Sequence, residues 1–204
     1  VGLDLGLKTY ATLSDNTKIK NPRFYKHEQK KLAKVQKRLS KLKKNKVKYV
    51  KTKKQVARVN ERISNKRSNF IHQQTKRLID KYDVIYVEDL NIKNMIENES
   101  KKQKEKQSFI KMNKSFHDVS WSSFINILVY KAENAGKQVV KVDPSYTSQT
   151  CSSCGYRQKL KLSDRKYNCP ICKLSIDRDL NASRNIKTVG SYSLAEKCLE
   201  APDF

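Results

Sequence analysis

The chain has 204 residues and a formal net charge of +25, from 45 lysines and arginines against 20 aspartates and glutamates. That length allows one or two domains with a packed core, and the charge predicts a polyanionic partner, because Lys and Arg displace counterions from phosphates. No apolar run approaches the ~18 residues of a membrane span, and no charged-then-apolar leader is present, so we expect neither a membrane partner nor a secretion signal. Nucleic acid is favoured over an anionic membrane surface, because the basic stretches alternate with aliphatic residues and Trp121 is the only tryptophan.

The first half of the chain predicts strands followed by a long helical hairpin. Residues 1–20 read as strands with a turn at 14–16. Residues 26–81 carry apolar side chains three or four positions apart, and Glu28 is the only acidic residue between Lys26 and Arg58. A charged helix face is most often only solvated, but the lack of acidic neighbours favours contact with phosphates. The candidate nucleic-acid contacts are Lys30, Lys34, Lys37, Arg38, Lys41, Lys44 and Lys48.

The second half alternates strands and helices. An apolar run at 83–87 predicts a strand that is buried on both faces, and the polar residues 91–114 predict a loop or mobile helix that could act as a lid. Further on, we expect a helix at 116–135, a strand at 138–142, a helix from Asp177 to Ile186 and an irregular tail from Thr188. This order predicts an α/β fold in which helices pack on a mixed sheet.

Four of the five cysteines form two C-x-x-C pairs. Cys151 and Cys154 make the first pair, Cys169 and Cys172 make the second, and fourteen residues separate Cys154 from Cys169. Four thiolates complete a closed tetrahedral set, which is typical of structural zinc. A redox pair or an iron–sulfur cluster is the competing interpretation, but redox C-x-x-C motifs occur singly at the start of a helix. We expect no role for Cys198, which stands apart near the C-terminus.

Carboxylates at the ends of predicted elements stand out in so basic a chain. Asp4 lies between two leucines in the first strand, Glu88 ends the apolar strand, and Asp177 and Asp179 begin the last helix. Three carboxylates from two strands and a helix would hold two Mg²⁺ ions, which serve phosphodiester cleavage. Each residue alone also has an ordinary explanation, namely a turn, a loop or, for Asp177, a helix N-cap.

Three segments together resemble the RuvC nuclease motifs of TnpB proteins. These OrfB-type RNA-guided DNA nucleases of transposons have long been described as transposases, and they are related to type V CRISPR effectors. The segments are Gly2-Leu3-Asp4-Leu5-Gly6, Val87-Glu88-Asp89-Leu90 and Asp177-Arg178-Asp179-Leu180-Asn181-Ala182. Tyr146–Gly155 resembles the start of the family's zinc ribbon, and the resemblance extends from residue 1 to about 187.

The resemblance implies a domain organisation. It implies an RNase H-like (RuvC) domain over residues 1–146 and 177–190, with the basic hairpin at 26–81 as an insertion. A zinc ribbon is implied at 147–176, followed by a tail at 191–204. The family pattern usually ends Asn-Ala-Ala, where this chain has Asn181-Ala182-Ser183, a change that we expect to leave the metals untouched.

The resemblance also implies residue roles and partners. Asp4, Glu88 and Asp179 match the residues that hold catalytic Mg²⁺ or Mn²⁺, and Asp177 is an alternative from the residues alone. The implied ligands of structural Zn²⁺ are Cys151, Cys154, Cys169 and Cys172. The implied partners are DNA and, in the full-length protein, a guide RNA that is held by an N-terminal region outside this sequence. We therefore expect a prokaryotic cytoplasmic protein at the nucleoid.

Two other functions compete with a metal-dependent DNA endonuclease. The first is a catalytically inactive remnant of a transposase that binds DNA or RNA through charge, with steep salt dependence and no turnover. The second is a strand-transferring transposase, which needs a tyrosine nucleophile or a 3′-hydroxyl attack at the transposon ends. That function is disfavoured, because His72 and His117 are isolated and the candidate tyrosines lack the adjacent His pair of a tyrosine transposase: Tyr10, Tyr82, Tyr86 and Tyr146.

Overall fold

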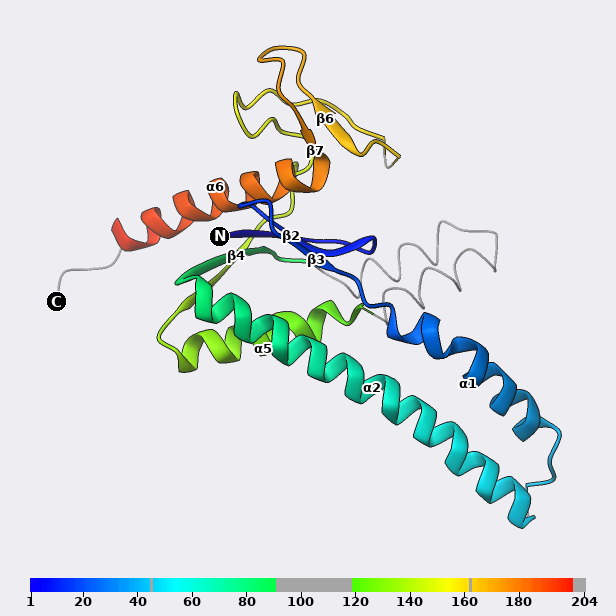
Figure 1. Ribbon diagram of the computed structural model, residues 1–204. Coiled ribbons are helices and arrows are strands. Elements are labelled where there is room, and N and C mark those ends of the chain that lie inside the picture. Colours follow the sequence, from blue (N-terminus) through cyan, green and yellow to red (C-terminus); the bar gives the residue numbers. More distant parts are fainter. Residues whose placement is uncertain (45, 91–118, 162, 200–204) are drawn as a thin grey trace.

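The computed structural model describes residues 1–44, 46–90, 119–161 and 163–199, the last four of these by their backbone alone. Its centre is a five-stranded sheet in the order β3-β2-β1-β4-β5 (Figure 1). The strands are β1 (Gly2–Leu5), β2 (Thr9–Leu13), β3 (Lys18–Lys20), β4 (Val84–Glu88) and β5 (Gln138–Val142). The first three strands pair antiparallel, whereas β1–β4 and β4–β5 pair parallel, so the predicted mixed sheet is confirmed.

Helices cover both faces of this sheet. Figure 1 shows α2 (Val47–Lys81) and α5 (Trp121–Asn134) together on one face and α6 (Arg178–Leu199) on the other. The side chains of β4 alternate accordingly: Ile85 and Val87 join the core beneath α2 and α5, and Tyr86 packs with Ile186 of α6. A strand covered on both faces requires apolar residues in both directions, which explains its continuous apolar run.

An aromatic cluster holds the root of the helical hairpin against the sheet. The ring of Tyr10 on β2 meets Phe70 of α2 and Phe124 of α5 edge to face, with centroids 4.9 and 5.3 Å apart. The buried Tyr10 hydroxyl donates a hydrogen bond to the Val119 carbonyl, at 3.0 Å. Aromatic pairs in this geometry stabilise a core beyond the area that they bury.

The predicted hairpin is formed by α1 (Phe24–Ser40) and α2, and it extends away from the sheet (Figure 1). The two helices share a small core of Leu32, Val59 and Ile63. Most other side chains of α1 and of the outer half of α2 are exposed. The hairpin is therefore a narrow arm with much more charged surface than interior.

The cysteine segment makes a second, smaller unit at the N-terminal end of α6 (Figure 1). Its strands, β6 (Lys166–Asn168) and β7 (Ser175–Asp177), pair antiparallel and form a two-stranded sheet that is separate from the five-stranded sheet. Cys151, Tyr167 and Cys169 are the buried residues of its core. So small a core predicts that this unit depends on a further source of stability.

The expected end of the last helix and the expected irregular tail after it were both wrong. The last helix does not end at Ile186, and the chain is not irregular from Thr188, because α6 continues to Leu199. Gly190 weakens the helical pattern in the sequence, but a Cβ at that position would clash with the ring of Tyr86, so the glycine allows close packing of helix and sheet. The helix expected at 116–135 is α5, which begins at Trp121.

The possible lid at 91–114, residues 116–118 and the side chain of Cys198 lie outside the described residues. Within the part of the chain that is described, no helix is both long enough and apolar enough to cross a bilayer.

Candidate metal-binding sites

Gly2 brings α6 directly onto β1. A Cβ on Gly2 would clash with the Ser183 carbonyl oxygen and lie 2.7 Å from the Lys187 backbone nitrogen, so any larger residue would push the helix away. Side chains alternate along a strand, so Asp4, two residues after Gly2, faces the same helix. Leu3 and Leu5 face the opposite way, into the core beneath α2 and α5.

The register of the sheet places Glu88 beside Asp4. In the parallel β1–β4 pair, Gly2 lies opposite Tyr86 and Leu3 lies opposite Val87. The next pair in this register is Asp4 and Glu88, and both lie on the face that α6 covers. The two predicted carboxylates therefore come from adjacent strands and point to the same side.

Asp179 lies in the first turn of α6, on the face that meets the sheet. Ser183, Ile186 and Gly190 occupy this face, at intervals of three or four residues from Asp179. The backbone around Ser183 contacts Gly2, and Gly190 lies against Tyr86. One turn before Ser183, the helix thus carries Asp179 toward Asp4.

The electrostatics of Asp4 agree with this convergence. Burial raises the pKa of Asp4 well above its ordinary value of 3.8, and the nearby carboxylates of Glu88 and Asp179 raise it further, against the opposing charge of Arg178. Burial also raises the pKa of Glu88. Crowded carboxylates are the ligands that Mg²⁺ and Mn²⁺ prefer, and such a cation would remove their mutual repulsion.

Asp177, the alternative to Asp179, has a different environment. Its Oδ1 accepts hydrogen bonds from the backbone N–H groups of Asp179 and Leu180, at 3.0 and 3.2 Å. Its Oδ2 forms an ion pair with Lys18 at 2.9 Å. Partial burial raises the pKa of Asp177, but these hydrogen bonds outweigh it and lower the pKa overall. Asp177 therefore caps α6, and Asp179 is the carboxylate on the sheet-facing side.

Thr147 is a site residue that the sequence did not single out. Its buried hydroxyl donates a hydrogen bond of 2.5 Å to Oε1 of Glu88. The hydroxyl partly offsets the effect of burial on the pKa of Glu88. Residue 147 was expected only to begin the cysteine segment, and no spacing pattern links a threonine to a carboxylate 59 residues earlier.

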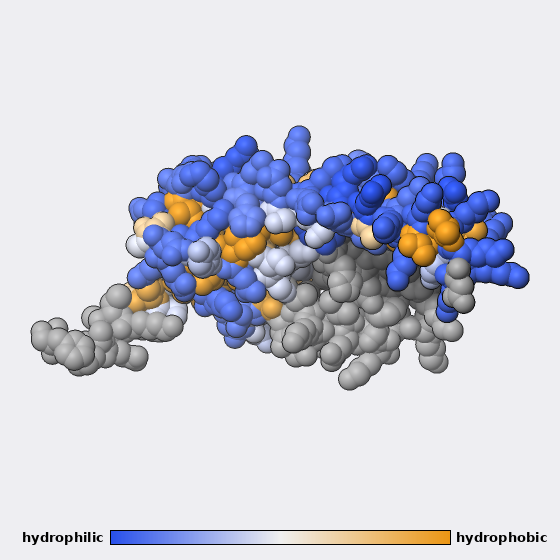
Figure 2. All heavy atoms as spheres, turned by 90° about the horizontal axis from the view of Figure 1, so that it is seen from below, coloured by the Kyte–Doolittle hydropathy of each residue, from blue (hydrophilic) through white to orange (hydrophobic). Residues whose placement is uncertain are grey.

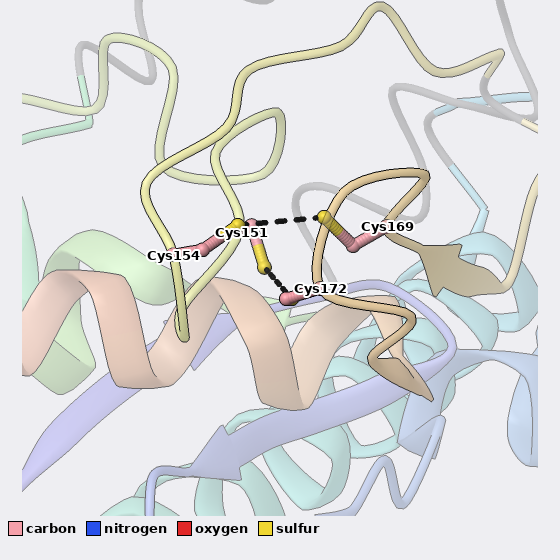
Figure 3. A group of neighbouring side chains, drawn as sticks. All are labelled: Cys151, Cys154, Cys169 and Cys172. Atoms are coloured by element: carbon pink, nitrogen blue, oxygen red, sulfur yellow. Dashed lines mark hydrogen bonds between the residues drawn. The ribbon is translucent and has the colours of Figure 1, made fainter.

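The four predicted cysteines converge from two loops, and their side chains point toward one another (Figure 3). The sulfur atoms of Cys151 and Cys172 are 3.6 Å apart, and those of Cys154 and Cys169 are 3.5 Å apart. Zn–S bonds of ~2.3 Å in a tetrahedron place sulfurs about 3.8 Å apart, so the set fits one zinc ion. A hydrogen bond from the Leu174 backbone N–H, with others from the neighbouring thiols, lowers the pKa of Cys172 to about 6. Against a hydrogen bond from the Tyr156 N–H, burial and hydrogen bonds with the other thiols raise the pKa of Cys154 to about 11. Without a metal, Cys172 is therefore the thiol that ionises more readily of the two.

The two ligand sets differ in spacing. Among the described residues, only the four cysteines bring three or more His, Cys, Asp or Glu ligand atoms within 4.8 Å of one another. The carboxylates of Asp4, Glu88 and Asp179 are close enough to raise the pKa of Asp4, but they do not meet this spacing. The cysteine cluster is a closed site, and the carboxylate cluster is an open one.

The basic hairpin presents its cations to solvent. Hydrophilic residues cover most of the described surface that Figure 2 shows. Glu28 is bound to Lys66 at 3.2 Å. The seven candidate contacts are all exposed, and none pairs with an acidic group in the described residues: Lys30, Lys34, Lys37, Arg38, Lys41, Lys44 and Lys48.

Two protein families match separate parts of this chain. Residues 1–99 match the OrfB_IS605 family, described as "Probable transposase", and residues 121–186 match the family described as "Cas12f1-like, TNB domain". The first match covers β1 to β4 with the hairpin, and the second covers α5, the cysteine unit and the start of α6. Both candidate metal-binding sites therefore lie within the matched segments.

Full-length relatives extend well beyond this chain. It is 33% identical over 192 residues to a Streptomyces pristinaespiralis protein named "Putative RNA-guided DNA endonuclease", which covers 93% of the chain and 45% of that relative. It is 34% identical over 200 residues to an Escherichia coli K12 protein named "Putative RNA-guided DNA endonuclease InsQ", with 96% and 50% covered. The chain thus spans about half the length of these curated relatives.

A solved structure shares the fold. The cryo-EM structure of a Cas12f1-sgRNA-target DNA complex matches with a TM-score of 0.57 and 19% sequence identity, over 91% of this chain and 48% of that one. At this identity the likeness concerns the arrangement of the elements alone. The mixed sheet with helices on both faces is therefore an arrangement that a solved protein also adopts.

Proposed function

The chain belongs to the TnpB/OrfB family, and we propose that it carries the divalent-metal-dependent DNA endonuclease site of an RNA-guided transposon protein. The observation that carries this proposal is the convergence of Asp4, Glu88 and Asp179 on the sheet face that α6 covers. Relatives that are named as RNA-guided DNA endonucleases support a nuclease role.

In this proposal the fold is RNase H-like, of the RuvC type, and the three carboxylates hold Mg²⁺ or Mn²⁺. When bound, the ions would activate water and stabilise the leaving oxygen of a phosphodiester. The chain's own contribution is orientation. Asp4 and Glu88 stand on paired strands, Asp179 on a helix that Gly2 allows close to them, and Thr147 holds one oxygen of Glu88.

The four cysteines are proposed to hold Zn²⁺ as a structural ion. Their thiolates leave no open ligand position, so a zinc ion there would serve folding rather than chemistry. The unit that it closes, residues 147–176, would be the zinc ribbon of the family, and its leading segment would contact the carboxylate site through Thr147.

The proposed partners are DNA and, in the longer protein, a guide RNA. The seven exposed cations of the hairpin would contact phosphates without sequence preference, because contacts with phosphates carry no information about the bases. The Cas12f1 structure that shares this fold was determined with guide RNA and target DNA.

Cleavage of labelled single-stranded and duplex DNA by the purified chain tests the proposal, with Mg²⁺ or Mn²⁺ against EDTA. We expect metal-dependent cutting that Glu88→Gln abolishes. Asp89→Asn is the matched control, because its exposed carboxylate pairs with Lys141 at 3.6 Å and lies outside the cluster. Cutting that survives Glu88→Gln would overturn the residue assignment.

The competing function is that of a nucleic-acid-binding remnant without catalysis. The seven exposed cations of the hairpin, which have no acidic partner among the described residues, favour binding as such. This function predicts tight, salt-sensitive binding and no turnover with any divalent ion. If the chain binds without cutting, the same assay on the longer protein with its guide RNA separates a remnant from an incomplete enzyme.

A further inference from the structure

Two buried asparagines of α6 fasten the leading segment of the cysteine unit. Asn181 donates a hydrogen bond to the Thr150 carbonyl at 2.7 Å and accepts one from the Ser152 backbone N–H at 2.9 Å. Asn185, one turn later, donates to the carbonyls of Thr147 and Thr150 at 2.8 and 2.7 Å. Both side chains are at least nine-tenths buried, so these bonds are protected from water.

The fastened segment connects the two candidate metal-binding sites. At one end lies Cys151, between two residues that the asparagines bind. At the other end lies Thr147, whose hydroxyl reaches Oε1 of Glu88 at 2.5 Å and lies 3.2 Å from the Pro144 carbonyl. An ionised carboxylate can only accept, so the hydroxyl proton goes to the shorter, charge-assisted bond with Glu88.

We propose that Thr147 is a positioning residue for Glu88, and that Asn181 and Asn185 keep it in place. The polar chain from α6 through the Thr147 backbone to the Glu88 carboxylate links the folding of the cysteine unit to the orientation of one carboxylate. The inference about metal binding at Glu88 rests on the proposed function, whereas the contact between Thr147 and Glu88 does not.

A thermal double-mutant cycle tests the contact without any divalent metal at the carboxylates. Thr147→Val keeps the shape and removes the hydroxyl, and Glu88→Leu removes the acceptor. We expect the shift in Tm from Thr147→Val to be smaller by about 2–6 °C in the Glu88→Leu background. Thr150→Val is the matched control, because its hydroxyl donates to the Tyr146 carbonyl, so its shift should be additive with that of Glu88→Leu. Additive shifts for Thr147→Val would overturn the proposal.

Titration with Mn²⁺, followed by electron paramagnetic resonance in the zinc-loaded chain, tests the consequence. Thr147→Val should weaken Mn²⁺ binding by about 10-fold or more, and Thr147→Ser, which keeps the hydroxyl, should restore it. Zinc content and DNA affinity should stay unchanged in both variants. Unaltered Mn²⁺ binding in Thr147→Val would contradict the positioning role.

Asn185→Ala tests whether the link extends to α6. It should weaken Mn²⁺ binding in the same direction as Thr147→Val, while Arg184→Ala, at the exposed neighbouring position, should not. Equal Mn²⁺ affinity in these two variants would show that Asn185 does not influence the orientation of Glu88. If the unaltered chain binds no Mn²⁺, the proposed nuclease function fails, and the thermal cycle alone decides the contact between Thr147 and Glu88.

Discussion

The two candidate metal-binding sites differ in the elements that carry their ligands. The four thiols lie on loops and within 4.8 Å of one another, and two of them, Cys151 and Cys169, form the buried core of their unit together with Tyr167 alone. The three carboxylates lie on two central strands of the five-stranded sheet and on the helix that packs against that sheet, and they do not meet this spacing. In the cysteine unit a metal ion would stabilise the fold, whereas at the sheet the fold itself would position the ligands of a metal ion.

This difference separates what each metal can do. Four sulfurs close the coordination of zinc, so its binding free energy becomes folding free energy. Three carboxylates do not complete the coordination of a Mg²⁺ ion, so they would leave ligand positions for water and substrate, which chemistry requires. A metal-free sheet site should therefore remain folded and carry its repulsion, and a metal-free cysteine unit should not remain folded.

Removal of one thiol gives the largest expected effect. Cys169→Ser should unfold the cysteine unit, because zinc contributes on the order of 10 kcal/mol to such units. Amide hydrogen exchange should show loss of protection over 150–176 while β1 and β4 stay protected. Protection that persists in the unit would break the comparison, because its core would then suffice without metal.

Asp4→Ala should have the next largest effect, and on activity alone. Cleavage should fall at least about 1,000-fold, since metal ligation is worth several kcal/mol of transition-state stabilisation. The metal-free Tm should stay level or rise, because the substitution removes a carboxylate crowded by two others. A large drop in Tm would show that Asp4 supports the fold, contrary to its assigned place.

Gly2→Ala should damage the sheet site through packing. The added Cβ would clash with backbone atoms of α6 and force the helix outward, at a cost of about 1–3 kcal/mol. Denaturant unfolding measures this loss, and Mn²⁺ binding should weaken as Asp179 moves away from Asp4. Zinc content should not change, which distinguishes this variant from Cys169→Ser.

The pH dependence of stability should report the carboxylate cluster when divalent ions are absent. Because the folded-state pKa of Asp4 lies above its ordinary value of 3.8, the folded chain binds more protons than the unfolded chain in the window between these values. Asp4 therefore contributes a loss of stability as pH rises through that window. Thermal unfolding of zinc-loaded protein without Mg²⁺ should show a shallower fall with pH in Asp4→Asn, and added Mg²⁺ should flatten the slope of the unaltered chain.

The smallest effect is expected outside both sites. Lys41→Gln on the exposed hairpin should leave Tm and zinc content unchanged, because the side chain has no acidic partner in the described residues. If Lys41 contacts one phosphate, the slope of log affinity against log salt should fall by about 1. Filter binding across a salt series measures this slope, and an unchanged slope would remove Lys41 from the interface.

Local pattern in the sequence determined the elements and one ligand set. The mixed sheet, the hairpin and the strand buried on both faces follow from periodicity, which acts over a few neighbouring residues. The two C-x-x-C pairs converge as their spacing predicts, because each knuckle holds its own two sulfurs and only one further contact is needed. Whether the bound ion is zinc stays a prediction.

Only the tertiary structure decided the remaining features. α6 continues through Gly190 to Leu199, and the glycine gives room for the ring of Tyr86, whereas in the sequence alone a glycine weakens a helical pattern. The different roles of Asp177 and Asp179 follow from the structure, in which Asp177 caps the helix and Asp179 faces β1. Thr147 meets Glu88 across 59 residues, a pairing that is set by the asparagines of α6 rather than by any local period.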